Sequence, residues 1–229
     1  MTRRHARTLP LLATLGIVLA ACQQPAIASE KIVRAPVAER KSDESGKLRT
    51  AIFAGGCFWG VEAVFSHVKG VTSAVSGYHG GNKATADYSR VSSGVTEHAE
   101  AVKITYDPSQ IRYDQLLRIL FSVVADPTLK NRQGPDRGAQ YRAAIVPTSA
   151  QQRAVAEAYL AQMGKSGIWD APIVTEVESY RTFYPAEEYH QDFAFKNPRH
   201  GYILRWDAPK VRALKELYPP VYREKPIRD

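Results

Sequence analysis

The chain has 229 residues with 31 basic and 23 acidic side chains, a formal net charge of +8 and only two cysteines. The first 21 residues carry three of the basic side chains and none of the acidic ones, so the remainder has a net charge of +5. The basic residues of this remainder are scattered, and no basic helix or aromatic-basic ladder is present. This pattern excludes a nucleic-acid-binding surface.

The first 21 residues have the pattern of an export signal. Three arginines in the first seven residues precede an apolar stretch over residues 9–21, which is too short for a stable membrane span. The segment Leu19-Ala20-Ala21-Cys22 resembles the bacterial lipoprotein cleavage box, so we expect Cys22 to become the lipidated first residue of the mature protein. The alternative is an ordinary signal peptide cleaved near Ala21.

The expected anchor predicts where the protein resides. Residues 22–47 contain prolines, Ser, Lys and Glu with little periodicity, which is typical of a flexible tether. A lipid-anchored domain facing the periplasm of the bacterial cell envelope is therefore expected. By resemblance to the sorting rule, Gln23 after the lipidated cysteine favours the outer membrane.

Residues 48–229 are long enough for one domain with its own core, and they show no internal repeat. Apolar periodicity and turn residues predict, in chain order, strand 48–54, helix 57–67, strand 71–78, strand 99–106, helix 113–124, strand 140–146, helix 149–164, strand 173–180, and helices near 186–195 and 209–217. Thr148 and Gln151 have capping-box spacing before the third helix. The first six elements spell β-α-β-β-α-β, which predicts an α+β fold, a two-layer split βαβ (ferredoxin-like) sandwich with a mixed sheet and a C-terminal extension. We expect a monomer.

Cys57 is the only cysteine after Cys22, and it lies at the predicted turn from the first strand to the first helix. A helix N-terminus presents unpaired N–H groups and the positive end of the helix dipole, which favour a thiolate over a thiol. Glycines on both sides of this turn allow close approach of a ligand, and Phe58 and Trp59 add an apolar wall. A buried, inert cysteine is the alternative for an isolated thiol, but this setting indicates a reactive sulfur.

Two long loops are predicted, over about residues 79–98 and 125–139. Loops of this length inside one domain are uncommon unless they are functional. The first carries Tyr88 and leads to Glu100, and the second carries Asp136 and leads to Tyr141. We expect no metal site, because His190 with its acidic neighbours has no second histidine or cysteine at ligand spacing.

Gly56-Cys57-Phe58-Trp59-Gly60 resembles the active-site motif of the A-type peptide methionine sulfoxide reductases, which act on the S sulfoxide. Three further blocks, in the same order along the chain, resemble that family. They are residues 77–100 (from Gly-Tyr-His-Gly-Gly to His-Ala-Glu), residues 131–142 (Asn-Arg-Gln-Gly-Pro-Asp, then Gly138, Gln140, Tyr141 and Arg142) and residues 187–198 (Glu-Glu-Tyr-His-Gln-Asp, then Lys-Asn-Pro). Together the blocks extend from about Arg49 to Gly201.

The resemblance implies a role for each matching residue. Cys57 would be the nucleophile and Glu100 the acid that protonates the sulfoxide oxygen. Phe58 and Trp59 would form a seat for the substrate methyl group, while Tyr88 and Tyr141 would donate hydrogen bonds and Asp136 would help to organise the site. These are the groups that the reaction needs: a nucleophile, an acid, donors around the oxygen and an apolar surface. Reduction would leave Cys57 as a sulfenic acid.

The chain departs from the family pattern in its C-terminal tail. Many members carry a second cysteine there, whereas residues 199–229 contain none. We therefore expect no bound cofactor and recycling by an external thiol, either a thioredoxin-like protein or a small thiol. Milder departures at Ala125, Arg137 and Ala139 affect partner or substrate preference. The expected activity is reduction of methionine sulfoxide, free or in proteins, as repair of oxidative damage.

Three other functions share some of these features. A peroxidase would form the same sulfenic acid but gives no role to Phe58 and Trp59. A cysteine hydrolase needs a histidine base, and no histidine is tied by motif to Cys57. A binding module for thioether or methyl groups would use the aromatic residues and leave the thiol without a role.

Overall fold

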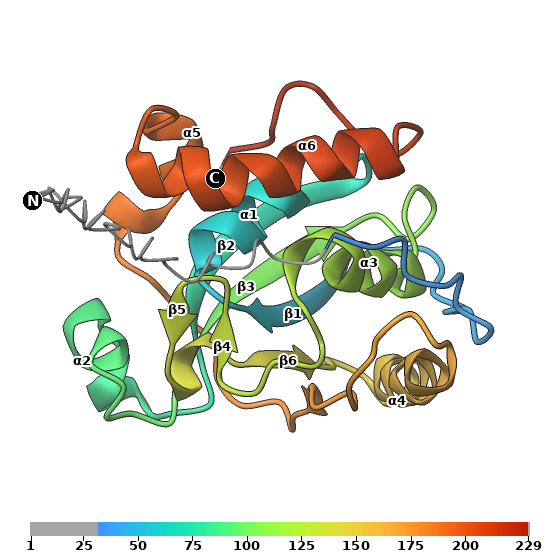
Figure 1. Cartoon of the computed structure of the whole chain (residues 1–229), viewed down its shortest axis with the longest axis horizontal. Helices are drawn as coiled ribbons and strands as arrows, with labels where there is room; N and C mark the ends of the chain where they lie inside the picture. The colour runs from blue at the N-terminus through green and yellow to red at the C-terminus, as the bar shows by residue number, and fades with distance from the viewer. Residues whose placement is uncertain (1–31, 229) are drawn as a thin grey trace, which may run out of the picture.

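The computed structural model describes residues 32–228, so the expected signal peptide and Cys22 lie outside the described residues. A six-stranded sheet forms the centre of the domain, in the order β7-β6-β1-β3-β2-β8 (Figure 1). Its strands are β1 (Arg49–Gly55), β2 (Val71–His79), β3 (Ala99–Tyr106), β6 (Ala143–Val146), β7 (Glu176–Val177) and β8 (Tyr184–Pro185). All neighbours are antiparallel except β6 and β7, which are parallel. The expected α+β class with a mixed sheet is confirmed.

The helices provide the second layer. They are α1 (Phe58–Ser66), α2 (Tyr88–Ser92), α3 (Tyr113–Ile119), α4 (Ala150–Lys165), α5 (Phe193–Lys196) and α6 (Ala208–Leu217). Buried residues of α1, α3, α4 and α6 share one core with Ala51, Phe53, Val102 and Ile104 of the sheet. Strand residues alternate between two faces, so Ile52, Ala54 and Ala101 point the other way and are covered by Phe183.

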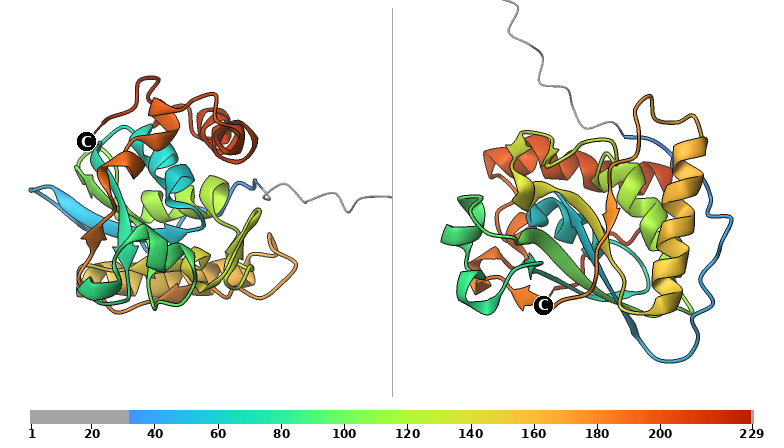
Figure 2. Two further views of the ribbon diagram at one scale, coloured as in Figure 1. Left: turned by 90° about the vertical axis from the view of Figure 1, so that its left-hand side faces the viewer. Right: turned by 90° about the horizontal axis from the view of Figure 1, so that it is seen from below.

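The four central strands run in the order β6-β1-β3-β2, and α1 connects β1 to β2. This brings the start of β3 beside the turn that begins α1. The ferredoxin-like description stays a prediction, because the sheet carries two further edge strands, β7 and β8. Figures 1 and 2 show α6 running alongside α1, so the C-terminal extension covers the first helix.

Several predicted boundaries are wrong for identifiable reasons. The helix over 113–124 is an α-helix only to Ile119 and continues as a π-helical turn, Leu120–Val124. The strand over 140–146 begins at Ala143, because a short 3-10 helix, Ala139–Tyr141, precedes it. Of the strand predicted over 173–180, only the two residues of β7 are observed, since only these two pair with β6. The helix near 186–195 is broken at Asp192, whose φ of 56° is left-handed.

The predicted capping box at α4 is displaced by one residue. Ser149 rather than Thr148 is the N-cap, and its Oγ accepts a hydrogen bond from the Gln152 N–H at 3.1 Å. Gln152 Oε1 in turn accepts from the Thr148 N–H at 2.9 Å.

The prediction of a flexible tether is wrong for residues 33–44, which are packed against the domain, while residues 45–47 are exposed. Ala35 and Ala38 are buried in the main core. The Val33 N–H donates to the Ser122 carbonyl oxygen, and the Ser42 N–H donates to Asp114 Oδ1 at 3.0 Å. Small alanine side chains and backbone bonds to buried polar groups hold this segment without helix or strand periodicity. Nothing in residues 32–228 forms a helix long and apolar enough to cross a membrane.

Candidate active site

The turn between β1 and α1 holds Cys57 as the residue that precedes the first helical turn. Gly56 before it has a φ of 88°, and a Cβ there would lie 2.7 Å from the Cβ of Gln133. Both facts require glycine at this position. The tight turn places the Cys57 side chain, which is partly exposed, at the N-terminus of α1.

Glu100, the second residue of β3, lies directly beside this turn. Its Oε2 accepts a hydrogen bond from the Phe58 N–H at 2.9 Å, and the residue is 1% exposed. The Cys57 thiol lies close enough to this carboxyl group for each to affect the pKa of the other. The structure therefore brings together the two residues that the sequence predicts as nucleophile and acid, although 43 positions separate them.

The carboxyl group of Glu100 stays protonated at neutral pH. Burial is the main cause and raises the pKa of Glu100 to about 8; Asp136 and Asp207 raise it further, while the Phe58 N–H opposes the shift. A buried carboxylic acid of this kind can donate a proton at pH 7.

The expectation of a thiolate at Cys57 is wrong for the protein without substrate. Burial, followed by the charges of Glu100 and Asp207, raises the pKa of the Cys57 thiol well above its usual value. The Trp59 N–H at the start of α1 opposes this shift but is outweighed. The prediction placed Cys57 correctly at a helix N-terminus. However, the N–H group there lowers the pKa of the thiol by less than burial, Glu100 and Asp207 raise it.

The two aromatic residues after Cys57 have different surroundings. Phe58 is completely buried, with its ring centroid 5.9 Å from that of Tyr78 and 5.0 Å from that of His190. Trp59 is partly exposed and stacks on Phe193 with centroids 3.7 Å apart and planes 7° apart. Of the two residues expected to form the methyl seat, Trp59 is therefore the one that solvent reaches, and Phe58 packs beside it with ring centroids 6.5 Å apart.

The two segments predicted as long loops bring their tyrosines near Cys57, although the first contains a 3-10 helix and α2 and the second contains a hairpin, β4 (Arg132–Gln133) and β5 (Asp136–Arg137). Tyr88 and Tyr141 are half-buried, and ionisation of Cys57 or Glu100 would raise the pKa of both phenols. Burial is the first cause that raises the pKa of each phenol, so both remain hydrogen-bond donors at neutral pH. Asp136, also half-buried, has its pKa raised by burial and accepts a hydrogen bond from the Tyr202 hydroxyl.

Sequence reasoning missed three residues of this site. Tyr202 lies just beyond the last recognised block. Cys57 is among the groups that raise the pKa of its phenol, and its ring makes an edge contact with the Trp59 indole. Asp207 and Lys210 are buried on the turn leading into α6 and on α6 itself. A Cβ at Gly60 would lie 2.3 Å from Asp207 Oδ1, which shows how closely these charges approach the first turn of α1. In a sequence, one charged residue per helical turn is typical of a solvent-exposed helix face. Nothing in the sequence therefore indicates that Asp207 and Lys210 are buried.

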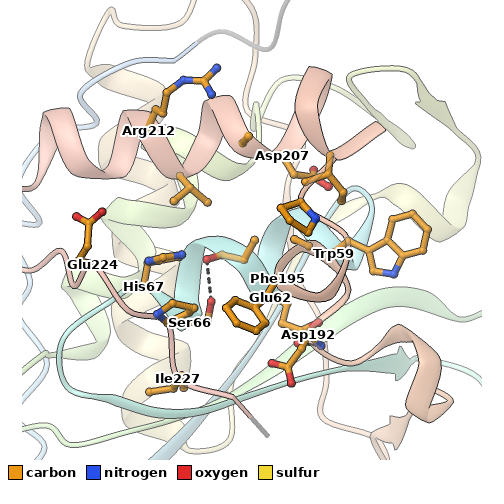
Figure 3. Close-up of a pocket in the computed structure, with 17 residues that line it drawn as sticks. Trp59, Glu62, Ser66, His67, Asp192, Phe195, Asp207, Arg212, Glu224 and Ile227 are labelled. Carbon is orange, nitrogen blue, oxygen red and sulfur yellow. Dashed lines mark hydrogen bonds between the residues drawn. The ribbon is translucent and has the colours of Figure 1, made fainter. Parts of the chain in front are cut away.

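A cavity of about 470 Å³ is lined in part by Trp59 (Figure 3). It is bounded by α1, the segment around α5, the start of α6 and the C-terminal residues, and Cys57 is not among its lining residues. Apart from acidic groups such as Glu62, Asp192 and Asp207, its surface is mainly apolar. Within residues 32–228, no group of three or more His, Cys, Asp and Glu side chains is placed to hold a metal ion.

A thiol beside a buried, neutral carboxylic acid, with two half-buried tyrosines and an indole in the same region, is typical of a cysteine-dependent enzyme that also uses an acid. The model of the family described as peptide methionine sulfoxide reductase matches residues 49–219. Peptide methionine sulfoxide reductase MsrA 2 of Mesorhizobium japonicum is 56% identical over 178 residues, covering 78% of this chain and 91% of the relative. The protein of the same name from Synechocystis is 54% identical, covering 73% of this chain and 78% of the relative.

Solved structures agree with these sequence relatives. Reduced Mxr1 of Saccharomyces cerevisiae matches with a TM-score of 0.57 and 29% identity, covering 71% of this chain and 92% of that chain. Methionine sulfoxide reductase A of Corynebacterium diphtheriae has the same score and identity, covering 74% and 84%. The chain belongs to the peptide methionine sulfoxide reductase family and is an oxidoreductase that reduces methionine sulfoxide, a repair reaction. The peroxidase, hydrolase and binding-module alternatives are therefore set aside.

Proposed function

We propose that this enzyme reduces the S sulfoxide of methionine, free or in proteins, through a sulfenic acid on Cys57. The observation that carries the proposal is the contact between the Cys57 thiol and a Glu100 carboxyl group whose pKa burial raises to about 8. A sulfoxide oxygen becomes a good leaving group only when it is protonated, and Glu100 supplies the proton from a position next to the nucleophile.

The proton transfers of the proposed reaction are consistent with a thiol, rather than a thiolate, at Cys57. Cys57 enters the reaction as a thiol, and its sulfur attacks the substrate sulfur while Glu100 protonates the sulfoxide oxygen. The attack gives an intermediate in which the two sulfurs are bonded and the former sulfoxide oxygen is a hydroxyl, and the Glu100 carboxylate accepts the thiol proton. The sulfur–sulfur bond then breaks as the hydroxyl moves to Cys57. The net change transfers one oxygen atom from methionine sulfoxide to Cys57, leaving methionine and a sulfenic acid.

The remaining residues hold the substrate. Tyr88 and Tyr141 keep their phenol protons and donate hydrogen bonds to the sulfoxide oxygen. Trp59, supported by Phe58 and Phe193, contacts the methyl group. Asp136, hydrogen-bonded by Tyr202, keeps the loop that carries Tyr141 beside the thiol.

Recycling of Cys57 requires a thiol from outside the chain. Cys57 is the only cysteine in residues 32–228, and only Cys22 lies elsewhere in the sequence. One external thiol condenses with the sulfenic acid and releases water, and a second reduces the mixed disulfide. A thioredoxin-like protein or a small thiol would serve.

A single turnover without reductant tests this cycle. We expect the Cys57 peptide to gain the mass of one oxygen atom and to react with dimedone, with one methionine released per enzyme. A mass decrease of two hydrogens, linking Cys57 to Cys22, would contradict external recycling. Cys22→Ser is the control, because it should show the same oxygen gain.

We further propose that Cys22 is lipidated and holds the enzyme in the bacterial cell envelope, facing the periplasm and attached to the outer membrane. The support is the cleavage-box pattern before Cys22 and the Gln23 that follows. Cells expressing the full chain should incorporate labelled palmitate into it, and Cys22→Ser should abolish the label. Equal labelling of the two proteins would contradict the anchor.

A further inference from the structure

The closest contacts of the Trp59 indole come from residues 186–196, a chain segment that we call the strap. The strap leaves the sheet after β8 and includes the 3-10 turn Glu188–His190 and α5. His190 Nδ1 accepts a hydrogen bond from Trp59 Nε1 at 3.1 Å, and the Phe193 ring stacks on the indole. His200 and Tyr202, beyond the strap, add edge contacts at centroid distances of 6.1 and 6.0 Å. The orientation of Trp59 therefore depends in large part on where the strap lies.

Glu62, one turn after Phe58 on α1, fixes the part of the strap between His190 and Phe193. It is 3% exposed, and its Oε1 accepts a hydrogen bond from the Asp192 N–H at 2.6 Å. Asp192 is left-handed, with a φ of 56°, a conformation that costs free energy for a residue other than glycine. A short bond to a buried carboxylate holds the backbone in this conformation.

The side chain of Glu62 also forms a hydrogen bond with the sheet. Glu62 Oε2 accepts a hydrogen bond from Ser76 Oγ on β2 at 2.5 Å. Gln191, beside Asp192, bonds both backbone groups of Ser76, at 2.9 Å to its N–H and 3.0 Å to its carbonyl oxygen. Helix α1, strand β2 and the strap thus meet at one buried group of side chains, with Glu62 at its centre.

Packing alone does not hold the strap at this point. Trp59, Glu62 and Asp192 all line the cavity of about 470 Å³ between α1 and the start of α6 (Figure 3). A segment that borders a cavity lacks the dense side-chain contacts that fix a core residue. The hydrogen bonds of Glu62 therefore add to those of Gln191 in fixing the strap on its cavity side.

We propose that Glu62 is a positioning residue for substrate binding: through Asp192 it keeps His190 and Phe193 against Trp59, so that the indole presents its face to the substrate methyl group. The inference rests on the proposed role of Trp59. It assigns Glu62 to binding rather than to chemistry, because Glu62 acts on Trp59 through the strap whereas Glu100 contacts the thiol.

Three variants test this role with an N-blocked methionine S-sulfoxide and excess dithiothreitol. Glu62→Ala should raise KM by about tenfold and change kcat by less than about threefold, the pattern of lost binding. Glu62→Gln should restore most of the affinity, since its oxygen accepts from the Asp192 N–H and its amide donates to Ser76 Oγ. Glu216→Ala, which alters an exposed glutamate of α6, is the matched control.

A second readout does not depend on turnover. With Trp169 and Trp206 replaced by Phe, the emission of Trp59 should shift to longer wavelength in Glu62→Ala and return in Glu62→Gln. Unchanged KM and emission in folded Glu62→Ala would overturn the inference, as would an equal fall in kcat and kcat/KM. If Glu62→Ala does not fold, Ser76→Ala removes one of the two bonds and should raise KM by about threefold. Failure of the wild-type enzyme to turn over would instead refute the proposed function.

Discussion

Glu100→Gln should lower kcat for methionine S-sulfoxide by about 10²-fold or more, the usual range for loss of a general acid. Glutamine keeps the shape of the side chain, and its oxygen can still accept from the Phe58 N–H. It has no acidic proton to give to the sulfoxide oxygen and no carboxylate to receive the proton of Cys57. The measurement is kcat at saturating substrate near pH 7.

Glu97→Gln is a suitable control for this change. Glu97 lies three residues earlier and is exposed, paired only with the exposed Arg181 at 3.2 Å, so its loss should leave kcat within about twofold. The wild-type rate should also fall as pH rises through about 8, because burial raises the pKa of Glu100 to about 8 and the acid form is then lost. Unchanged kcat in Glu100→Gln would remove Glu100 from the mechanism.

The same substitution should stabilise the fold at alkaline pH. The folded pKa of Glu100 is about 8, whereas that of the unfolded chain is near the ordinary value of 4.5. Between these pH values the folded state keeps a proton that the unfolded state releases, so the free energy of unfolding decreases as pH rises. The decrease levels off above pH 8 and amounts to roughly 5 kcal/mol, at 1.36 kcal/mol for each pKa unit.

Glu100→Gln has no such titration. Chemical unfolding of both proteins at several pH values between about 5 and 8.5 should show their difference in stability growing in favour of the variant. Parallel pH dependence of the two proteins would show that Glu100 is not buried as a neutral acid. Activity lost together with stability gained is the combination expected when a group is present for catalysis at a cost to folding.

Local patterns predicted the parts of the site that local structure determines. Alternating apolar residues predicted β3 with its observed bounds, and the glycines around Cys57 predicted the turn that exposes the sulfur. The partnership of Cys57 with Glu100 came from the family resemblance, because it depends on β3 lying next to β1 in the sheet. The roles of Tyr88, Tyr141 and Asp136 have the same origin.

Features that depend on distant contacts could not be predicted. The pKa of Cys57 is set by burial and by Glu100, Asp207 and Asp136, which meet only in the folded chain. Residues 33–47 resemble a tether in composition, yet Ala35 and Ala38 fit between α3 and α4 because their side chains are small. The strap was predicted as a helix, but the bonds of Gln191 and Asp192 to β2 and α1 break it.

The most direct test of the account compares the two sulfoxide epimers. The purified enzyme is given separated S and R sulfoxides of an N-blocked methionine with excess dithiothreitol, and methionine formation is measured. We expect consumption of the S epimer alone, abolished by Cys57→Ser. Consumption of both epimers at equal rates, or of the S epimer by Cys57→Ser, would contradict attack by Cys57 in a site shaped by Trp59, Tyr88 and Tyr141.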